Sequence, residues 1–204
     1  MTSNDITIHR GLTGVYFDRS DTTFIDGKEG VLEYRGYNIN QLAEHSTFEE
    51  TGYLLIHGKL PTQAELNEFD AELKAARELP SKIFDVLELV KDSHPMDALR
   101  TAVSALASFD EDRNDNSPEA TIRKGNRLTS QVPSIVMAHH NIRQGKDPIK
   151  PSTTLNHAGN FLYMLNGDVP SADTAKLMDK DFVLHADHGS NASAFTARVV
   201  AGTA

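Results

Sequence analysis

Cysteine is absent from the 204 residues of this sequence. Its absence excludes disulfides, thiolate nucleophiles and zinc sites built from cysteine, and it agrees with a reducing compartment, so we expect a cytoplasmic protein. The sequence also has no run of eighteen apolar residues, and it begins with polar residues rather than with a basic segment leading into an apolar one. We therefore expect neither secretion nor a membrane anchor.

Basic residues are fewer than acidic ones. The sequence has 29 acidic and 20 basic residues, which gives a formal net charge of -9 at pH 7. A surface of this sign disfavours nucleic acid and anionic lipid as partners, and an anionic small molecule would need a locally basic pocket. Hydrophobic residues make up 39% of the chain. That is enough for one sizeable domain, or the larger part of a bigger one, burying about 70% of the surface of its unfolded chain.

Short segments rich in β-forming residues lie near the N-terminus. Three of them, Gly14–Phe17, Thr22–Ile25 and Val31–Tyr34, are separated by turn residues and predict two or three short strands. The pair Asp26-Gly27 between two apolar runs indicates a hairpin, with a loop longer than two residues. These strands define a small N-terminal β element at residues 1–37.

Apolar residues recur at helical spacing over residues 38–204. Capping boxes at Ser46–Glu49 and Thr62–Glu65 predict the starts of two helices, of which the first ends at Gly58 and the second runs up to Pro80. The whole pattern predicts seven to nine helices. The expected fold class is therefore mainly α, a multi-helical large domain behind the small β element.

Proline marks further helix starts. Ser93 precedes Pro95 as a cap residue, and a helix that begins at Pro118, with Pro133 as a kink, follows a polar loop at 110–116. Small residues, mostly alanine, alternate with larger apolar side chains in the helix after Pro95. We expect this helix to be buried on more than one side, because small side chains let a second helix approach closely.

The densest group of polar side chains is the segment His185-Ala186-Asp187-His188, which lies between two helical runs. On a continuous helix His185 and His188 would share a face, an arrangement that also occurs in metal sites. Two ligands do not make a site, however, and no third cluster of histidines is paired with them. We therefore predict no metal here, and a metal-dependent hydrolase that uses His185, Asp187 and His188 is a minor alternative.

Four stretches stand in a characteristic order and spacing: Leu32–Tyr37 (LEYRGY), Leu54–Pro61 (LLIHGKLP), His94–Ser104 (HPMDALRTAVS) and Leu184–Ser193 (LHADHGSNAS). Together they resemble the citrate synthase family, in the shorter bacterial and archaeal type that includes 2-methylcitrate synthase. The resemblance covers nearly the whole chain. It implies an acyltransferase that condenses acetyl-CoA, its acyl-CoA substrate, with oxaloacetate to give citrate and CoA. It also implies no cofactor and a homodimer formed through helices.

The sequence departs from the family in one respect. The family's aspartate base and two histidines lie in Gly-Pro-x-His-Gly-Gly, Gly-x-Gly-His and Asn-x-Asp motifs, and none of these occurs here. The resemblance therefore implies about the N-terminal half of such an enzyme, without its smaller CoA-binding domain, without catalytic residues, and inactive alone. The apolar segment Thr196–Ala204 has no polar tail, which also favours a truncated protein.

The resemblance carries over site residues one by one. His188 matches the family histidine that hydrogen-bonds oxaloacetate, and an imidazole is a suitable donor to the oxygens of an α-keto acid. His185, Asn191 and Ser193 are expected at the border of the substrate site. For the segment that begins the last helix the alternative is ordinary N-capping, by Asn191 or by Ser190.

Two rival functions stay open. A 2-methylcitrate synthase uses propionyl-CoA, and the extra methylene is worth only about 1–3 kcal/mol, so a full site could accept both substrates. The second rival is a non-catalytic helical dimerisation module. Helices at 95–109 and 117–143, with the two final helices, resemble those that pair across the dimer interface of the family.

Overall fold

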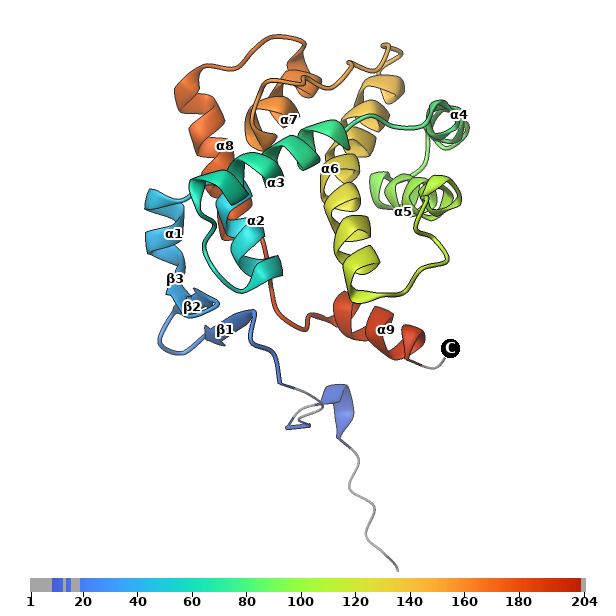
Figure 1. The fold of residues 1–204 in the computed structure, drawn as a ribbon. Helices are drawn as coiled ribbons and strands as arrows, with labels where there is room; N and C mark the ends of the chain where they lie inside the picture. Colours follow the sequence, from blue (N-terminus) through green and yellow to red (C-terminus); the bar gives the residue numbers. More distant parts are fainter. Residues whose placement is uncertain (1–8, 13, 16–18, 203–204) are drawn as a thin grey trace, which may run out of the picture.

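The computed structural model describes residues 9–12, 14–15 and 19–202 (Figure 1). Within them the chain forms nine α-helices behind a small three-stranded sheet, so the predicted mainly α fold is confirmed. The expected strand at Gly14–Phe17 lies partly outside the described residues. The elements are β1 (Thr23–Asp26), β2 (Val31–Tyr34), β3 (Tyr37–Asn38), α1 (Ile39–His45), α2 (Phe48–His57), α3 (Gln63–Ala75), α4 (Ser81–Leu89), α5 (Pro95–Leu106), α6 (Pro118–Arg143), α7 (His157–Asn166), α8 (Ala172–Leu184) and α9 (Ala192–Ala201).

The sheet is antiparallel in the order β1-β2-β3. Arg35 and Gly36 make the turn from β2 to β3, and both have positive φ, 51° and 83°, as a tight two-residue hairpin turn of the common type requires. Glycine adopts this φ freely, whereas an arginine there is strained. Three hydrogen bonds stabilise Arg35: its backbone N–H donates to the Thr22 carbonyl at 2.8 Å, and its Nε and Nη2 donate to the Leu55 carbonyl at 3.3 and 2.9 Å. The hairpin is thereby attached to α2.

The start of α2 differs from the prediction by one residue. Thr47 and Glu50 form the capping box there, rather than the predicted box at Ser46–Glu49. The reason is tertiary: Glu49 turns into the protein, where its carboxylate accepts a hydrogen bond from the N–H of His157 at 2.7 Å. Ser46 is also the C-cap of α1, and its N–H, which a Ser46–Glu49 box would direct to Glu49, donates instead to the Leu42 carbonyl at 2.8 Å.

Other helix ends follow local chemistry more closely. Gly58 ends α2 with a φ of 77°, and the predicted box at Thr62–Glu65 opens α3; both predictions are confirmed. The prediction that the helix runs up to Pro80 is wrong, because α3 ends at Ala75. Arg77 then turns its side chain inward, and its Nη1 donates at 2.8 Å to two carbonyls of the loop before α7.

Helix α5 has a different cap residue from the predicted one, whereas α6 begins at the predicted residue. His94, not Ser93, caps α5, and its Nδ1 accepts the N–H of Met96 at 3.2 Å. The predicted start at Pro118 is confirmed, and α6 continues through Pro133 for 26 residues in all. Within the described part of the chain, neither α6 nor any other helix combines the length and apolar character needed to cross a membrane.

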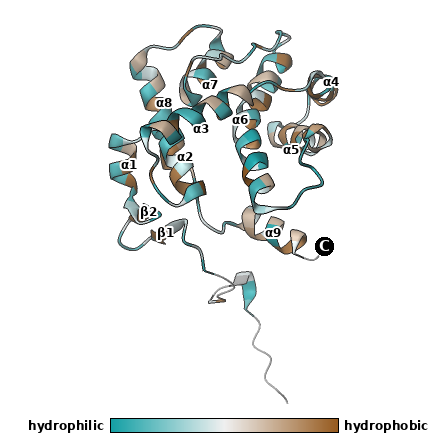
Figure 2. Ribbon diagram, viewed as in Figure 1, coloured by the Kyte–Doolittle hydropathy of each residue, from teal (hydrophilic) through white to brown (hydrophobic). Residues whose placement is uncertain are grey.

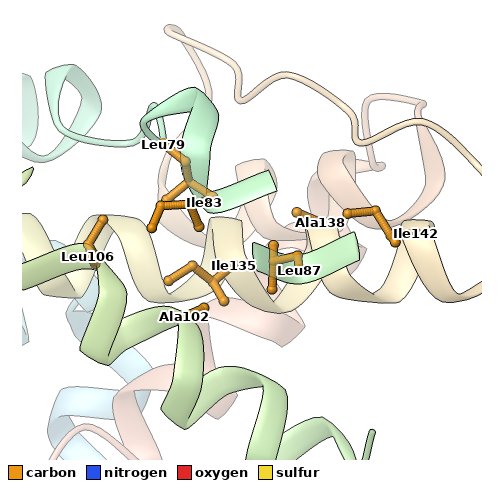
Figure 3. Packing of buried hydrophobic residues seen from close by; sticks show 8 residues of the cluster. All are labelled: Leu79, Ile83, Leu87, Ala102, Leu106, Ile135, Ala138 and Ile142. Carbon is orange, nitrogen blue, oxygen red and sulfur yellow. The ribbon is translucent and has the colours of Figure 1, made fainter. Parts of the chain in front are cut away.

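The largest hydrophobic cluster lies between α4, α5 and α6 (Figure 3). Ala102 of α5 and Ala138 of α6 are buried in it, and their small size lets the helices approach closely. Each buried leucine or isoleucine stabilises the fold by roughly 1.5–3 kcal/mol. The cluster consists of Leu79, Ile83, Leu87, Ala102, Leu106, Ile135, Ala138 and Ile142.

A second cluster joins the sheet to α1, α2 and α8. Its buried members are Tyr34, Ile39, Leu42, Leu54 and Val183. Because Val183 is in the last turn of α8, the residues that follow this helix emerge beside β1 and β2. The final helix differs from the others: Figure 2 colours α9 mostly in the apolar range, yet it has no buried residue.

Candidate substrate-binding loop

The polar segment identified in the sequence forms a loop between α8 and α9. Helix α8 ends at Leu184, and His185 is its C-cap residue. His185 and His188 are therefore not on one continuous helix, and the shared face considered for a metal site does not form. Within the described residues no group of three or more His, Cys, Asp or Glu side chains is placed to hold a metal ion.

The buried hydroxyl of Tyr34 lies against the backbone of this loop. Its oxygen is 3.2 Å from the Leu184 carbonyl and 3.0 Å from the Asp187 carbonyl, and it accepts the N–H of Asp187 at 3.3 Å. Burial raises the pKa of Tyr34, with the charge of Asp187 adding to the effect, so the hydroxyl keeps its proton and can donate it. The end of β2 thus binds the loop directly before His188.

The carboxylate of Asp187 makes a second set of contacts. It accepts hydrogen bonds from the hydroxyl of Thr23, on β1, and from the N–H of Gly189 at 3.0 Å. Gly189 has a φ of 58°, a conformation that L side chains rarely adopt. The backbone is therefore fixed on both sides of His188, by Asp187 before it and Gly189 after it.

His188 itself projects from this fixed backbone. Its side chain is exposed, and among the described residues none is recorded as a hydrogen-bond or ion-pair partner of its imidazole. A histidine ring can donate and accept hydrogen bonds. The arrangement combines a defined backbone with a side chain that is available to a ligand.

The three residues expected at the border of the site lie on either side of His188. The ring of His185 folds back onto α8, where its Nδ1 is 2.8 Å from the Asp181 carbonyl. Asn191 caps α9 and its Oδ1 accepts the N–H groups of Ser193 and Ala194, both at 3.0 Å. The capping role considered for Asn191 is therefore present in the structure.

A cavity of about 300 Å³ lies on the inner side of the loop. Most of its wall is apolar and comes from α2 and α3, and among the described residues that line it Asp187 alone carries a charge. Thr129 adds one residue of α6 to the lining. The residues that line it are Thr22, Phe48, Gly52, Leu55, Ile56, Phe69, Leu73, Thr129, Ala186 and Asp187.

Sequence reasoning did not identify Tyr34 and Thr23 as supports of the loop. The only available signal was weak: a tyrosine on the buried face of a strand needs a partner for its hydroxyl. Which partner it takes depends on tertiary structure, because the hydrogen bond to the Asp187 carbonyl spans 153 positions in the chain.

Comparisons with known proteins agree on one family. The family described as citrate synthase, C-terminal domain, matches residues 11–204. The chain is 47% identical to the citrate synthase of Deinococcus radiodurans over 197 residues, which cover 96% of this chain and 52% of that protein. It is 38% identical to the 2-methylcitrate synthase of Mycobacterium tuberculosis over 197 residues, covering 96% of this chain and 50% of that protein.

A solved structure gives the same result. The crystal structure of the citrate synthase from Pyrobaculum aerophilum matches with a TM-score of 0.93 and 36% sequence identity, covering 100% of this chain and 53% of that chain. The chain therefore spans about half the length of the relatives that it matches.

Proposed function

The chain belongs to the citrate synthase family, and from this premise we propose that the whole protein condenses acetyl-CoA with oxaloacetate to give citrate and CoA. The proposal assigns substrate orientation to this chain and places the reactive groups in the other half, so the chain has no catalytic residue and needs no cofactor. It includes the division into a β element at 1–37 and an incomplete helical domain at 38–204. A chain free of cysteine also supports a cytoplasmic location.

His188 is the residue that we propose to bind oxaloacetate, by donating a hydrogen bond from its imidazole. The observation that carries this role is the contrast between a backbone fixed on both sides of the residue and an exposed imidazole without a recorded partner. A hydrogen bond to a charged group is worth about 1.5–3 kcal/mol. His185, Asn191 and Ser193 are proposed to border the same site.

Replacing His188 with alanine tests the assignment in the whole protein. We expect His188→Ala to raise the KM for oxaloacetate by about 10- to 150-fold, the equivalent of that hydrogen bond, and to change the KM for acetyl-CoA little. Steady-state kinetics with each substrate varied in turn measure both values. His185→Ala is the matched control, because the His185 ring is engaged by Asp181, and its effect should be smaller. An equal loss toward both substrates would indicate a structural role for His188.

A second candidate activity is that of a 2-methylcitrate synthase. The observation that favours it is the 38% identity to the Mycobacterium tuberculosis enzyme of that name over 96% of this chain. One methylene changes binding by only about 1–3 kcal/mol, so acetyl-CoA and propionyl-CoA should differ by at most about 200-fold. The ratio of kcat/KM for the two thioesters decides between a citrate synthase and a 2-methylcitrate synthase.

If the whole protein turned over neither thioester, a non-catalytic helical module would be the better description.

We also propose that the protein is a homodimer that pairs through α5, α6, α8 and α9. Exposed apolar side chains on or next to α5 and α6 support this surface. Met96 of α5 is 63% exposed, Leu128 of α6 is 40% exposed, and Phe109, just beyond α5, is 48% exposed. Burying such side chains against a second copy stabilises an association by roughly 25 cal/mol for each Å² removed from water.

A further inference from the structure

The loop that carries His188 has no regular structure of its own, so its shape depends on groups from elsewhere in the fold. Residues 186–190 lie between the end of α8 and the start of α9. Their polar backbone groups would otherwise be satisfied by water or left unpaired, and an unpaired buried group costs about 1–3 kcal/mol. Ala186 donates its N–H to α8 at the Val183 carbonyl, and Gly189 pairs within the loop. Asp187, next to His188, takes its partners from β1 and β2.

Two side chains of the β1–β2 hairpin, Thr23 and Tyr34, form hydrogen bonds with this loop. They come from positions that face each other, because Thr23 of β1 pairs with Tyr34 of β2 in the sheet register. Tyr34 reaches the backbone on the N-terminal side of His188, at Asp187. Thr23 reaches the Asp187 carboxylate, which in turn accepts the N–H of Gly189 on the C-terminal side.

A tyrosine hydroxyl has one proton and two lone pairs. Near the loop it can therefore donate to only one of the two carbonyls, of Leu184 or Asp187, while it accepts the N–H of Asp187. Removing this single oxygen would deprive a carbonyl and an N–H of their partners together. The backbone immediately before His188 would then be free to change direction.

We propose that Tyr34, Thr23 and Asp187 form a clasp that positions the His188 imidazole for the substrate. The clasp acts through the backbone, so its members are positioning residues and do not touch the substrate themselves. The proposal rests on the proposed function, since it assigns the fixed imidazole to oxaloacetate. It goes beyond that function by placing the control of substrate orientation in a β-hairpin at the opposite end of the sequence.

The test is made on the whole protein with Tyr34→Phe, which removes only the hydroxyl. We expect the KM for oxaloacetate to rise by about 10-fold, the scale of one or two hydrogen bonds, while the KM for acetyl-CoA stays within about twofold. Tyr37→Phe is the matched control, because Tyr37 is on the neighbouring strand of the same sheet and is exposed. It should leave both values unchanged.

Thr23 provides a rescue experiment. Thr23→Val keeps the shape of the side chain but removes its hydroxyl, and should also raise the KM for oxaloacetate. Thr23→Ser keeps the hydroxyl and should recover most of that loss. If valine and serine had the same effect, packing rather than the hydrogen bond to Asp187 would be responsible, and the clasp would be wrong.

Hydrogen exchange separates the clasp from the proposed function. In the wild type the amides of Asp187 and Gly189 should exchange slowly. Tyr34→Phe should increase the exchange rate of the Asp187 amide by at least about 10-fold and leave the exchange rates of the amides in α6 unchanged. Faster exchange with an unchanged KM for oxaloacetate would overturn the positioning role alone. A wild type that exchanges slowly but does not use oxaloacetate would overturn the proposed function, and with it the substrate of the clasp.

Discussion

Buried ionisable side chains connect the helices behind the loop. Glu49 of α2 accepts the N–H of His157, the first residue of α7, and Asp179 of α8 accepts the N–H of Phe48 at 3.2 Å. Burial raises the pKa of both carboxyls. Each carboxyl thus lies at the positive end of a neighbouring helix, where a negative charge is favourable.

His157 shows the opposite shift. Its imidazole is buried and stacks on Phe48 with ring centroids 4.5 Å apart. Burial, with a smaller contribution from the nearby charge of Arg77, lowers the pKa of His157 from 6.5 to about 4. The ring is therefore neutral in the folded protein at neutral pH, and in the unfolded chain it binds a proton below about pH 6.5.

This difference predicts how stability depends on pH. Between pH 6.5 and 4 the unfolded state binds the extra proton, so the contribution of His157 is full above pH 6.5 and is lost as the pH falls toward 4. A pKa lowered from 6.5 to about 4 corresponds to about 3 kcal/mol. His157→Phe keeps a ring for stacking and has no proton to bind. Urea unfolding should therefore show that wild type loses up to about 3 kcal/mol more than His157→Phe between pH 7 and 4.

Comparing the wild type with His157→Phe separates the pH-dependent contribution of His157 to stability from the contributions of the buried carboxyls. The raised pKa values of Glu49 and Asp179 give stability that is lost as the pH rises through the folded values, the opposite direction, and both proteins share that term. His45→Phe, at an exposed position of α1, is the control for adding a phenyl ring and should behave as the wild type. Parallel pH curves for wild type and His157→Phe would contradict the prediction.

At the scale of the elements, two helical glycines have opposite surroundings. A Cβ added at Gly125 of α6 would meet nothing within 4 Å, whereas one added at Gly159 of α7 would lie 2.7 Å from Oδ1 of Asn156. That oxygen caps α7 by accepting the N–H of Gly159 at 2.9 Å. Within one chain, the same substitution therefore acts on helix propensity in α6 and on a cap in α7.

We predict opposite signs for the two alanine variants. Gly125→Ala should stabilise the protein by about 0.5–1 kcal/mol, the difference in helix propensity. Gly159→Ala should destabilise it by about 1 kcal/mol, because displacing Asn156 removes a cap worth about 0.5–2 kcal/mol and leaves an N–H unpaired. Urea midpoints with an unchanged m-value measure both. Equal gains in the two variants would show that Asn156 moves aside freely.

Local signals predicted the elements well where neighbours in sequence decide them. The box at Thr62–Glu65 and the end at Gly58 depend on contacts within a few residues, and both were predictable. The shifted start of α2 was not, because Glu49 is drawn to His157, 108 positions away. For the same reason the early end of α3, where Arg77 turns inward, was not predictable.

At the scale of the whole molecule, the proposed dimer predicts a mass. Sedimentation equilibrium of the wild type should give twice the mass of one chain. Leu128→Glu should shift the protein toward the monomer, because it places a charge in an interface that excludes water. Leu89→Glu is the matched control: Leu89 is 86% exposed and is on α4, outside the proposed interface, so this variant should stay dimeric. A monomeric wild type would refute the dimer.

The candidate site was predictable only in part, because some of its contacts join residues that are far apart in the sequence. The sequence predicts a substrate role for His188 from its place in a family motif, and this stays a prediction; it also indicated Asn191 as a cap, which the structure contains. It could not identify Tyr34 and Thr23, because nothing in a strand pattern specifies which distant backbone a hydroxyl will meet. Most side chains that act on their own neighbours were predictable from the sequence, with the His94 cap of α5 as an exception, whereas those that join two ends of the chain were not.

The clasp between β2 and the loop also has a consequence for biosynthesis. Its hydrogen bond joins residues 153 positions apart, and ribosomes add about 5–20 residues per second. The hairpin therefore waits roughly 8–30 s before the segment that it binds has been made. Contacts of such high sequence separation form late in folding. The loop that carries His188 is thus among the last parts of this chain to take shape, although the strands that hold it are among the first to be synthesised.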